Sequence, residues 1–177
     1  MNEPSLADRD ELIQRLISDF GSDIWNYIFS LTRNVDLADD LTQDCFVRAY
    51  THLETFRRES TIKTWLLKIA RNLVYDQMKS ASFTRVAVAP KVPENLGSTS
   101  AEQEALKNIV SEEIWRMVLT LPDKLREVLV LHAHHELSVA EVGELLGITQ
   151  RAVRTRLHRA RSMMRTLLKE GGWNGLE

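Results

Sequence analysis

The segment Leu137–Arg161 reads LSVAEVGELLGITQRAVRTRLHRAR, and its pattern predicts two short helices joined by a tight turn. Ser138 and Glu141 have the spacing of a capping box, in which each side chain bonds to a free backbone N–H. Gly147 suits the end of the first helix, and Thr149 can cap the second. Apolar residues recur at helical spacing on both sides of the turn, namely Val139, Val142, Leu145, Leu146, Val153, Leu157, Ala160 and Met164. This is the pattern of a helix-turn-helix, whose second helix lies in the DNA major groove.

Arginine dominates the second of these helices. Six arginines fall within the fifteen residues 151–165, and no acidic residue stands between Gln150 and Met164. An ordinary helical hairpin whose arginines only face solvent would show the same apolar pattern. A basic run without acidic partners is, however, poorly suited to surface ion pairing and well suited to phosphate contact. We therefore predict that this hairpin binds DNA.

The composition is that of a helical protein with one domain or two small ones. The chain has 177 residues, 44% of them hydrophobic, with only four prolines and seven glycines. No apolar run approaches the roughly 18 residues of a membrane helix, and the first twenty residues are unlike a signal peptide. The single cysteine, Cys45, is expected to be a small buried residue in a reducing compartment. We therefore expect a cytoplasmic protein without membrane insertion.

Charge alternates along the chain, although the net charge is only −2. Residues 1–55 carry 4 basic and 11 acidic residues, or −7, and residues 56–91 carry 8 and 2, or +6. Residues 92–137 carry 4 and 8, or −4, and residues 138–177 carry 7 and 4, or +3. Two separate basic blocks indicate two contacts with nucleic acid rather than a generally basic surface.

Three helices are predicted in the N-terminal acidic block. The first spans 8–20 and ends at Gly21, and Ser22 caps the second. The third spans roughly 36–53 and buries one stripe, Leu37, Leu41, Cys45, Ala49 and Leu53. Its opposite face consists of Asp39, Asp40, Gln43, Asp44 and Val47. Asp40 and Asp44 repel one another at a cost of a few tenths of a kcal/mol, roughly. Either the helix dipole offsets this repulsion, or the face awaits a basic partner.

A further helix over 61–79 follows the short loop 55–60. Its buried side is predicted to consist of Ile62, Trp65, Leu66, Ile69 and Leu73. Another face carries basic, aromatic and amide side chains, namely Lys68, Asn72, Tyr75 and Lys79, with Lys63 and Arg71 nearby. Such a face suits exposed bases in single-stranded or distorted DNA, although a solvated helix face has the same spacing. Phe56 in the loop either folds back onto the core or presents its ring to an unstacked base.

Residues 85–99 contain two prolines, a glycine and mostly small or polar residues, which predicts a flexible linker. This linker divides a domain at 1–84 from one at 100–177. Beyond it, Ser100 and Gln103 form a second capping box, and Pro122 suits the first turn of the next helix.

The sequence shows no pattern typical of an enzyme. It lacks a Gly-rich phosphate loop, a nucleophile elbow and a His-Glu-x-x-His segment. His132 and His135 share a helix face, but no cysteine or further histidine lies at ligand spacing. We therefore predict no catalytic residues, no metal site and no cofactor.

In the order of its motifs the chain resembles the extracytoplasmic-function (ECF) sigma factors, the smallest sigma subunits of bacterial RNA polymerase. The resemblance covers nearly the whole chain. It rests on Asp39–Ala49, on Phe56–Arg57 with Thr64–Leu66 and Ile69–Asn72, and on Leu121–Pro122 with the Arg-rich hairpin. It implies an all-α fold of two small helical domains, region 2-like at 1–84 and region 4-like at 100–177. The implied function is that of an alternative sigma factor, which binds core RNA polymerase, directs initiation at promoter DNA and assists promoter melting.

The resemblance also implies a role for each surface. Core polymerase would be bound by Asp39, Asp40, Gln43, Asp44 and Val47. The promoter −10 element would be bound by Phe56, Arg57, Lys68, Arg71, Asn72, Tyr75 and Lys79, with Phe56 and Asn72 holding an extruded base. The −35 element would be read by Gln150, Arg151, Arg154, Thr155 and His158, while phosphates would be contacted by Arg156, Arg159 and Arg161. An anti-sigma factor is a further implied partner.

A stand-alone helix-turn-helix regulator is the alternative interpretation. In it, residues 1–82 would be a sensing or dimerising module, and a dimer would bind a palindromic operator without polymerase. The second basic block separates the two interpretations, because a repressor has no need of a stacking face with Phe56, Asn72 and Tyr75.

Overall fold

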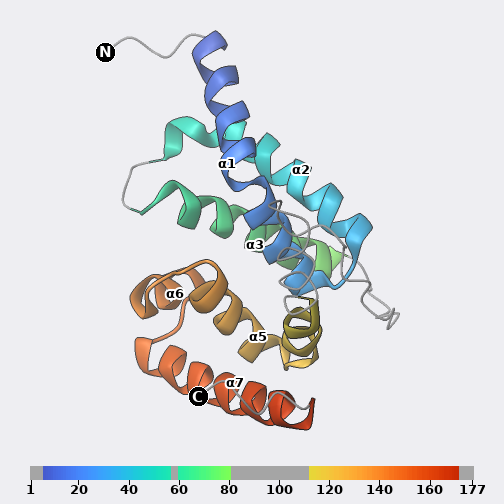
Figure 1. Cartoon of the computed structure of the whole chain (residues 1–177). Coiled ribbons are helices and arrows are strands. Elements are labelled where there is room, and N and C mark those ends of the chain that lie inside the picture. Colours follow the sequence, from blue (N-terminus) through green and yellow to red (C-terminus); the bar gives the residue numbers. More distant parts are fainter. Residues whose placement is uncertain (1–5, 57–59, 81–111, 172–177) are drawn as a thin grey trace, which may run out of the picture. The chain divides into compact units, whose positions relative to one another are not determined.

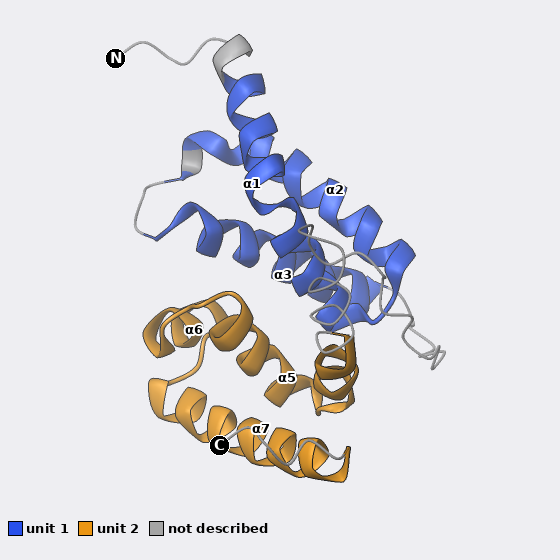
Figure 2. Cartoon of the chain, in the orientation of Figure 1, with its two compact units in different colours: residues 1–87 blue, residues 88–177 orange. Residues whose placement is uncertain are grey.

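The computed structural model describes residues 6–56, 60–80 and 112–171. All regular secondary structure in these ranges is helical, as predicted. The chain forms two compact units, Met1–Ala87 (unit 1) and Val88–Glu177 (unit 2), shown in Figures 1 and 2. The predicted linker over 85–99 and the helix start at Ser100 lie outside the described residues. Among the helices that are described, none has the length and apolar character needed to cross a membrane.

Unit 1 is built from three packed helices. They are α1 (Leu6–Thr32), α2 (Val35–His52) and α3 (Ile62–Ser80), with a short 3₁₀ turn, η1 (Leu53–Thr55), after α2. Each of the three helices contacts the other two (Figure 2). Their apolar faces therefore meet in one core.

Helix α1 is a single helix of 27 residues, so the predicted break at Gly21 is wrong. Buried residues recur at helical spacing on both sides of this glycine, namely Ile13, Leu16, Ile24, Ile28 and Leu31. A glycine inside a helix costs only about 1 kcal/mol, which the burial of one continuous apolar stripe outweighs. Leu12 and Ile17 lie off that stripe and are 42% and 41% exposed.

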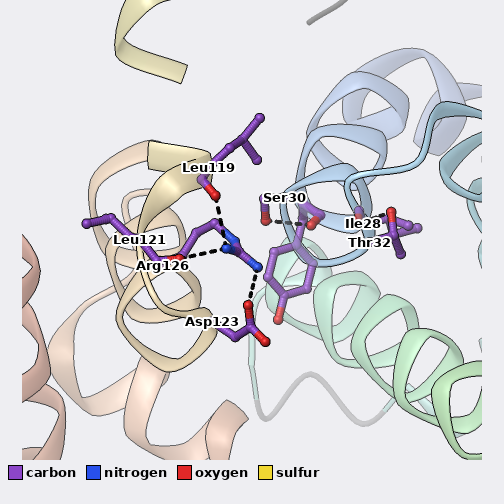
Figure 3. Close-up of polar contacts among 8 residues, drawn as sticks. Ile28, Ser30, Thr32, Leu119, Leu121, Asp123 and Arg126 are labelled. Carbon is purple, nitrogen blue, oxygen red and sulfur yellow. Dashed lines mark hydrogen bonds and ion pairs between the residues drawn. The ribbon is translucent and has the colours of Figure 1, made fainter. Parts of the chain in front are cut away.

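A tight turn joins α1 to α2. Arg33 adopts a positive φ of 55°, and Asn34 caps α2 by accepting a hydrogen bond of 3.0 Å from the backbone N–H of Leu37. The hydroxyls of Ser30 and Thr32 donate to backbone carbonyls in the preceding turn of α1 (Figure 3). Polar groups at the end of α1 are thus satisfied locally.

The buried faces of α2 and α3 contain some, but not all, of the residues predicted to be buried. The buried residues of α2 are Ala38, Leu41, Cys45, Phe46 and Ala49, which confirms the expectation that Cys45 is buried. The buried residues of α3 are Thr64, Leu66, Leu67, Ala70, Leu73 and Val74. Trp65 and Ile69 are only half-buried, because the buried stripe is rotated relative to the predicted one. This rotation leaves Trp65 at the edge of the bundle.

Unit 2 contains a helical segment over 112–120, then α5 (Asp123–Leu129), a π-helical turn η2 (Val130–His134), α6 (Val139–Leu146) and α7 (Gln150–Glu170). Helices α5 and α6 both pack on α7. Their shared core consists chiefly of Val128, Leu131, Val142, Leu145, Val153, Leu157 and Ala160.

A buried arginine fixes the turn that enters α5. Arg126 is 1% exposed, and its Nη1 donates to the carbonyl oxygens of Leu119 and Leu121 at 3.3 and 2.8 Å (Figure 3). Its Nη2 forms an ion pair of 2.8 Å with Asp123. Pro122 stands at the N-cap of α5, one residue before the predicted position. The guanidinium therefore satisfies carbonyls at this helix junction, which lacks a side-chain cap.

The helix-turn-helix has the predicted local contacts. The Ser138 hydroxyl accepts from the Glu141 N–H at 3.2 Å, and the Glu141 carboxylate accepts from the Ser138 N–H at 2.9 Å, which is a complete capping box. Gly147 has a φ of 66°, and Thr149 caps α7 by accepting from the N–H of Ala152 at 3.2 Å. The turn is therefore determined by residues close together in the sequence.

Candidate nucleic-acid and partner interfaces

The N-terminal half of α7 presents a basic face. Exposed side chains on it are Gln150, Arg151, Arg154, Thr155, His158, Arg159 and Arg161, whereas Arg156 is half-buried. Among the residues that the structure describes, none of the six arginines between 151 and 165 forms an ion pair. The charge of this face is therefore available for phosphates.

Two of the predicted base-reading residues lie one turn apart at the start of α7. Arg154 Nη2 donates to Gln150 Oε1 at 3.3 Å, and both side chains are exposed. The N-terminal residues of a recognition helix are those that contact base edges, and arginine pairs bidentately with guanine. The Thr155 hydroxyl donates to the Arg151 carbonyl at 2.9 Å, which leaves its oxygen as an acceptor.

The acidic face of α2 is exposed throughout. Asp39, Asp40, Gln43 and Asp44 are exposed, and the apolar side chain of Val47 is 62% exposed beside them. Within the described ranges, Asp40 and Asp44 have no ion pair or hydrogen-bonding side-chain partner. The face therefore combines uncompensated negative charge with exposed apolar surface.

Asp39 differs from the other acidic residues of this face. Its carboxylate accepts a hydrogen bond of 2.6 Å from the indole Nε1 of Trp25, on α1. The Trp25 ring is stacked on Phe29, with a centroid distance of 5.1 Å and an interplanar angle of 13°. Trp25 thus lies at the edge of the acidic face. The sequence alone does not predict this contact, because Trp25 and Asp39 lie on different helices.

The predicted basic face of α3 is present but unevenly exposed. Lys68, Asn72 and Lys79 are exposed, whereas Arg71 and Tyr75 are half-buried. The Arg71 guanidinium lies over the Tyr75 ring, 4.4 Å from its centroid, in a cation–π contact. Arg57 lies outside the described residues. Lys63, predicted to lie near this face, forms an ion pair of 2.8 Å with Asp23 of α1, so that its charge is neutralised.

Phe56 folds back onto its own unit, which is one of the two positions that the sequence allowed. Its ring lies against Trp65, with a centroid distance of 5.3 Å and an interplanar angle of 46°. Both rings are half-buried. Thr61 caps α3 by accepting from the Thr64 N–H at 3.1 Å, which places Trp65 in the first turn of that helix. Trp65 therefore lies next to Phe56 at the candidate site. The sequence did not indicate this position, because helical spacing placed Trp65 on the predicted buried side.

Cys45 is buried, and its thiol is unreactive at neutral pH. Burial raises the pKa of its thiol to about 12, and the Sγ lies 3.6 Å from the Leu66 carbonyl oxygen, to which it can donate. A thiol that stays protonated at neutral pH is neither a good nucleophile nor a metal ligand. Cys45 is best understood as a core residue of unit 1.

Together, a helix-turn-helix unit and a second helical unit with one acidic and one basic face define a DNA-binding transcription factor with several macromolecular contacts. The family model for Sigma-70 region 2 matches residues 16–84, and the model for Sigma-70, region 4 matches residues 111–164. The chain belongs to the ECF sigma factors of bacterial RNA polymerase.

Two named sigma factors match most of the chain in sequence. The ECF RNA polymerase sigma factor SigW of Bacillus subtilis is 32% identical over 157 residues, which cover 83% of each protein. The RNA polymerase sigma factor YlaC of the same organism is 35% identical over 157 residues, covering 84% of this chain and 87% of YlaC.

Solved structures show the same fold. The sigma factor RpoE of Bartonella quintana, in complex with the anti-sigma factor NepR, has a TM-score of 0.70 and 23% identity, with 90% of this chain and 97% of that chain covered. CnrH, in complex with the cytosolic domain of CnrY, has a TM-score of 0.63 and 23% identity, covering 91% and 90%.

These matches establish what the protein does at the level of the whole chain. It is an alternative sigma factor, and it directs promoter-specific initiation of transcription. The alternative of a stand-alone operator-binding regulator is not favoured, because the module that it assigned to sensing or dimerisation matches Sigma-70 region 2.

Proposed function

We propose that three surfaces divide the work of this sigma factor. The acidic face of α2 binds core RNA polymerase, the face of α3 with Phe56 binds the −10 element, and the face of α7 reads the −35 element. Residues 1–84 and 100–177 act as the two functional domains, and 85–99 as the tether between them. The main support for this proposal is that two charged faces lack ion-pair partners within the described residues. These are the negative face of α2, with Asp40 and Asp44, and the positive face of α7, with its six arginines.

The acidic face of α2 suits a basic partner. Asp40 and Asp44 stand one helical turn apart, so each raises the electrostatic energy of the other until cations approach. Exposed Val47 supplies the apolar contact that an interface needs beside its charged groups. The hydrogen bond from Trp25 fixes one oxygen of Asp39 and so orients this carboxylate for the partner.

On α3, the exposed residues supply two kinds of contact. Lys68 and Lys79 attract phosphates, and the exposed amide of Asn72 can bond to the edge of an unpaired base. Extruding a base costs a few kcal/mol, roughly, and stacking on a half-buried ring such as Phe56 returns part of it. Tyr75 holds Arg71 in place through the cation–π contact. We assign Arg57 to phosphate contact beside Phe56.

The start of α7 supplies the base contacts of the −35 site. Gln150, Arg151, Arg154, Thr155 and His158 read base edges, and Arg156, Arg159 and Arg161 bind the flanking phosphates. Arg156 is half-buried, unlike the five proposed base readers, and Arg159 and Arg161 lie beyond the N-terminal turns of α7, from which base contacts come.

The remaining proposals concern the setting of the protein. We place it in the cytoplasm with RNA polymerase, and we assign it no catalytic chemistry, metal or cofactor. We also propose an anti-sigma factor as a regulatory partner, which is supported by the similar structure of RpoE with NepR.

Charge reversal on α2 tests the polymerase-binding proposal. Asp40→Arg with Asp44→Arg should abolish co-purification with core polymerase while the helical circular dichroism stays unchanged. Asp19→Arg with Asp76→Arg is the matched control, since it reverses two exposed acidic residues on α1 and α3. Retention of polymerase by the α2 variant, or equal loss in the control, would show that this face is not the polymerase contact.

A further inference from the structure

The first turns of α1 contact the end of α2 and the 3₁₀ turn η1. Arg9 Nη2 forms an ion pair of 2.6 Å with Glu54 Oε1, and the two residues are 45 positions apart. The Arg9 guanidinium also lies over the Tyr50 ring, 5.9 Å from its centroid. Arg9 precedes the Sigma-70 region 2 match, which covers residues 16–84, whereas Tyr50 and Glu54 lie within it.

Arg9 is held more firmly than an ordinary surface arginine. Its side chain is only 20% exposed, whereas Glu54 is 68% exposed. The Arg9 Nε is buried and has no hydrogen-bond partner among the described residues. The charge of the guanidinium is instead balanced by Glu54, which contacts Nη2, and by the face of the Tyr50 ring. A partly buried guanidinium fixed between a carboxylate and a ring restricts the turn to which these groups belong.

The restricted turn leads directly to Phe56. Glu54 is the middle residue of η1, and the Phe56 N–H closes this turn by donating to the Leu53 carbonyl at 3.2 Å. The Phe56 ring then rests on Trp65 in the first turn of α3. Contacts therefore run from the start of α1 through Glu54 to the aromatic pair at the candidate −10 site.

We propose that Arg9 is a positioning residue for promoter melting, which holds η1 so that the Phe56 ring is placed against Trp65 before DNA arrives. This inference rests on the proposed role of Phe56 at the −10 element. A preplaced ring spares the complex the loss of conformational freedom at the moment when the base is extruded. The start of α1 thereby supports the −10 site through η1, without being assigned a DNA contact of its own.

The rate of promoter melting by the reconstituted holoenzyme tests this role of Arg9. Melting can be followed with 2-aminopurine placed in the −10 element of a duplex promoter. Arg9→Ala and Glu54→Gln should each slow melting roughly three- to tenfold, which is the range for losing one partly exposed charge-assisted contact. The double variant should be no slower than either single variant, because both remove the same contact. Arg15→Ala is the control, since its partner Glu11 lies on α1 itself.

A pre-melted promoter separates positioning from a general defect. On a template whose −10 segment is already unpaired, Arg9→Ala and Glu54→Gln should initiate as fast as the wild type, and their affinity for core polymerase should be unchanged. Equal defects on duplex and pre-melted templates, or wild-type melting rates for both variants, would overturn the inference. Glu54 is mostly exposed, so Glu54→Gln keeps the test valid even if Arg9→Ala folds poorly.

Phe56→Ala distinguishes the inference from the proposed function beneath it. If Phe56→Ala slows melting while Arg9→Ala and Glu54→Gln behave as wild type, the −10 assignment stands and the positioning role fails. If Phe56→Ala melts the duplex as fast as wild type, the −10 role of Phe56 itself fails and the positioning role fails with it.

Discussion

The functional surfaces of the two units are fixed by different kinds of contact. In the helix-turn-helix of unit 2 the contacting residues are close in sequence, whereas in the helical bundle of unit 1 they are far apart in sequence. In the helix-turn-helix, Ser138 bonds to Glu141 and Thr149 to a residue three positions on. In unit 1, Arg9 reaches Glu54 across 45 positions, and comparable contacts join α1 to the other two helices. The α7 surface is thus set by local sequence, whereas the unit 1 surfaces depend on tertiary packing.

The largest expected effect concerns the close approach inside the helix-turn-helix. A Cβ on Gly143 would lie 2.9 Å from the backbone carbonyl oxygen of Ile148, and backbone cannot easily move away. Gly143→Ala should therefore lower the free energy of unfolding of unit 2 by about 3 kcal/mol. Denaturant titration with hydrogen exchange of the α7 amides measures this loss.

Gly147→Ala is the matched control for that substitution. Gly147 has a φ of 66° but no atom within 4 Å of its would-be Cβ, so only the backbone conformation is strained, at about 1 kcal/mol. A larger loss for Gly147→Ala than for Gly143→Ala would mean that conformation, rather than close approach, limits the turn.

Arg154→Ala tests whether the locally determined surface reads sequence. Loss of a bidentate base contact should weaken binding of the holoenzyme to its −35 element by about 1–3 kcal/mol, with little change on other sequences. Arg165→Ala removes the same charge further along α7, and its effect should be similar on every sequence. A uniform loss for Arg154→Ala, measured by competition binding at fixed salt, would reduce its role to phosphate contact.

Trp25→Phe probes a long-range contact of unit 1. Phenylalanine keeps a ring against Phe29 but cannot donate to Asp39, so the free energy of unfolding should fall by about 1 kcal/mol. Affinity for core polymerase should fall severalfold as well, because Asp39 is no longer oriented. An unchanged affinity, with Asp39→Asn also neutral, would exclude Asp39 from the interface.

The smallest expected effect is the pH dependence of the capping box. Hydrogen bonds from the Ser138 hydroxyl and N–H lower the pKa of Glu141 in the folded protein. The carboxylate therefore stabilises the fold at pH values above its ordinary pKa, and this stabilisation is lost as the pH falls through the lowered value. Glu141→Gln should remove this dependence, with an effect below about 1 kcal/mol because the site is partly exposed. Thermal unfolding between pH 3 and 7 measures it, and Ser138→Ala should weaken it.

Local rules explain why the helix-turn-helix was predictable. Capping residues, a glycine in the left-handed region and one apolar stripe all act within a few positions, and each was visible in the sequence. Gly143 was missed because its role depends on the distance between two backbone segments, which helical periodicity does not contain. A small residue five positions before Ile148 was the only available signal.

Unit 1 shows where sequence reasoning stops. Helical phase placed the acidic residues of α2 on an exposed face, as the structure shows. The phase could not show that Trp25 reaches Asp39, because that contact depends on how α1 and α2 are packed. Gly21 does not end α1 as predicted, because the apolar stripe continues past it and the burial of that stripe outweighs the low helix propensity of glycine. The position of Phe56 stayed open because Trp65 lies across a loop.

The most direct test of the account is a footprint of the chain on a promoter selected by run-off transcription, with and without core polymerase. With polymerase, we predict two separate protected segments, at the −35 and −10 elements, and permanganate-reactive thymines within the −10 element. Symmetric protection of an inverted repeat by the chain alone, unchanged when core polymerase is added, would contradict the account.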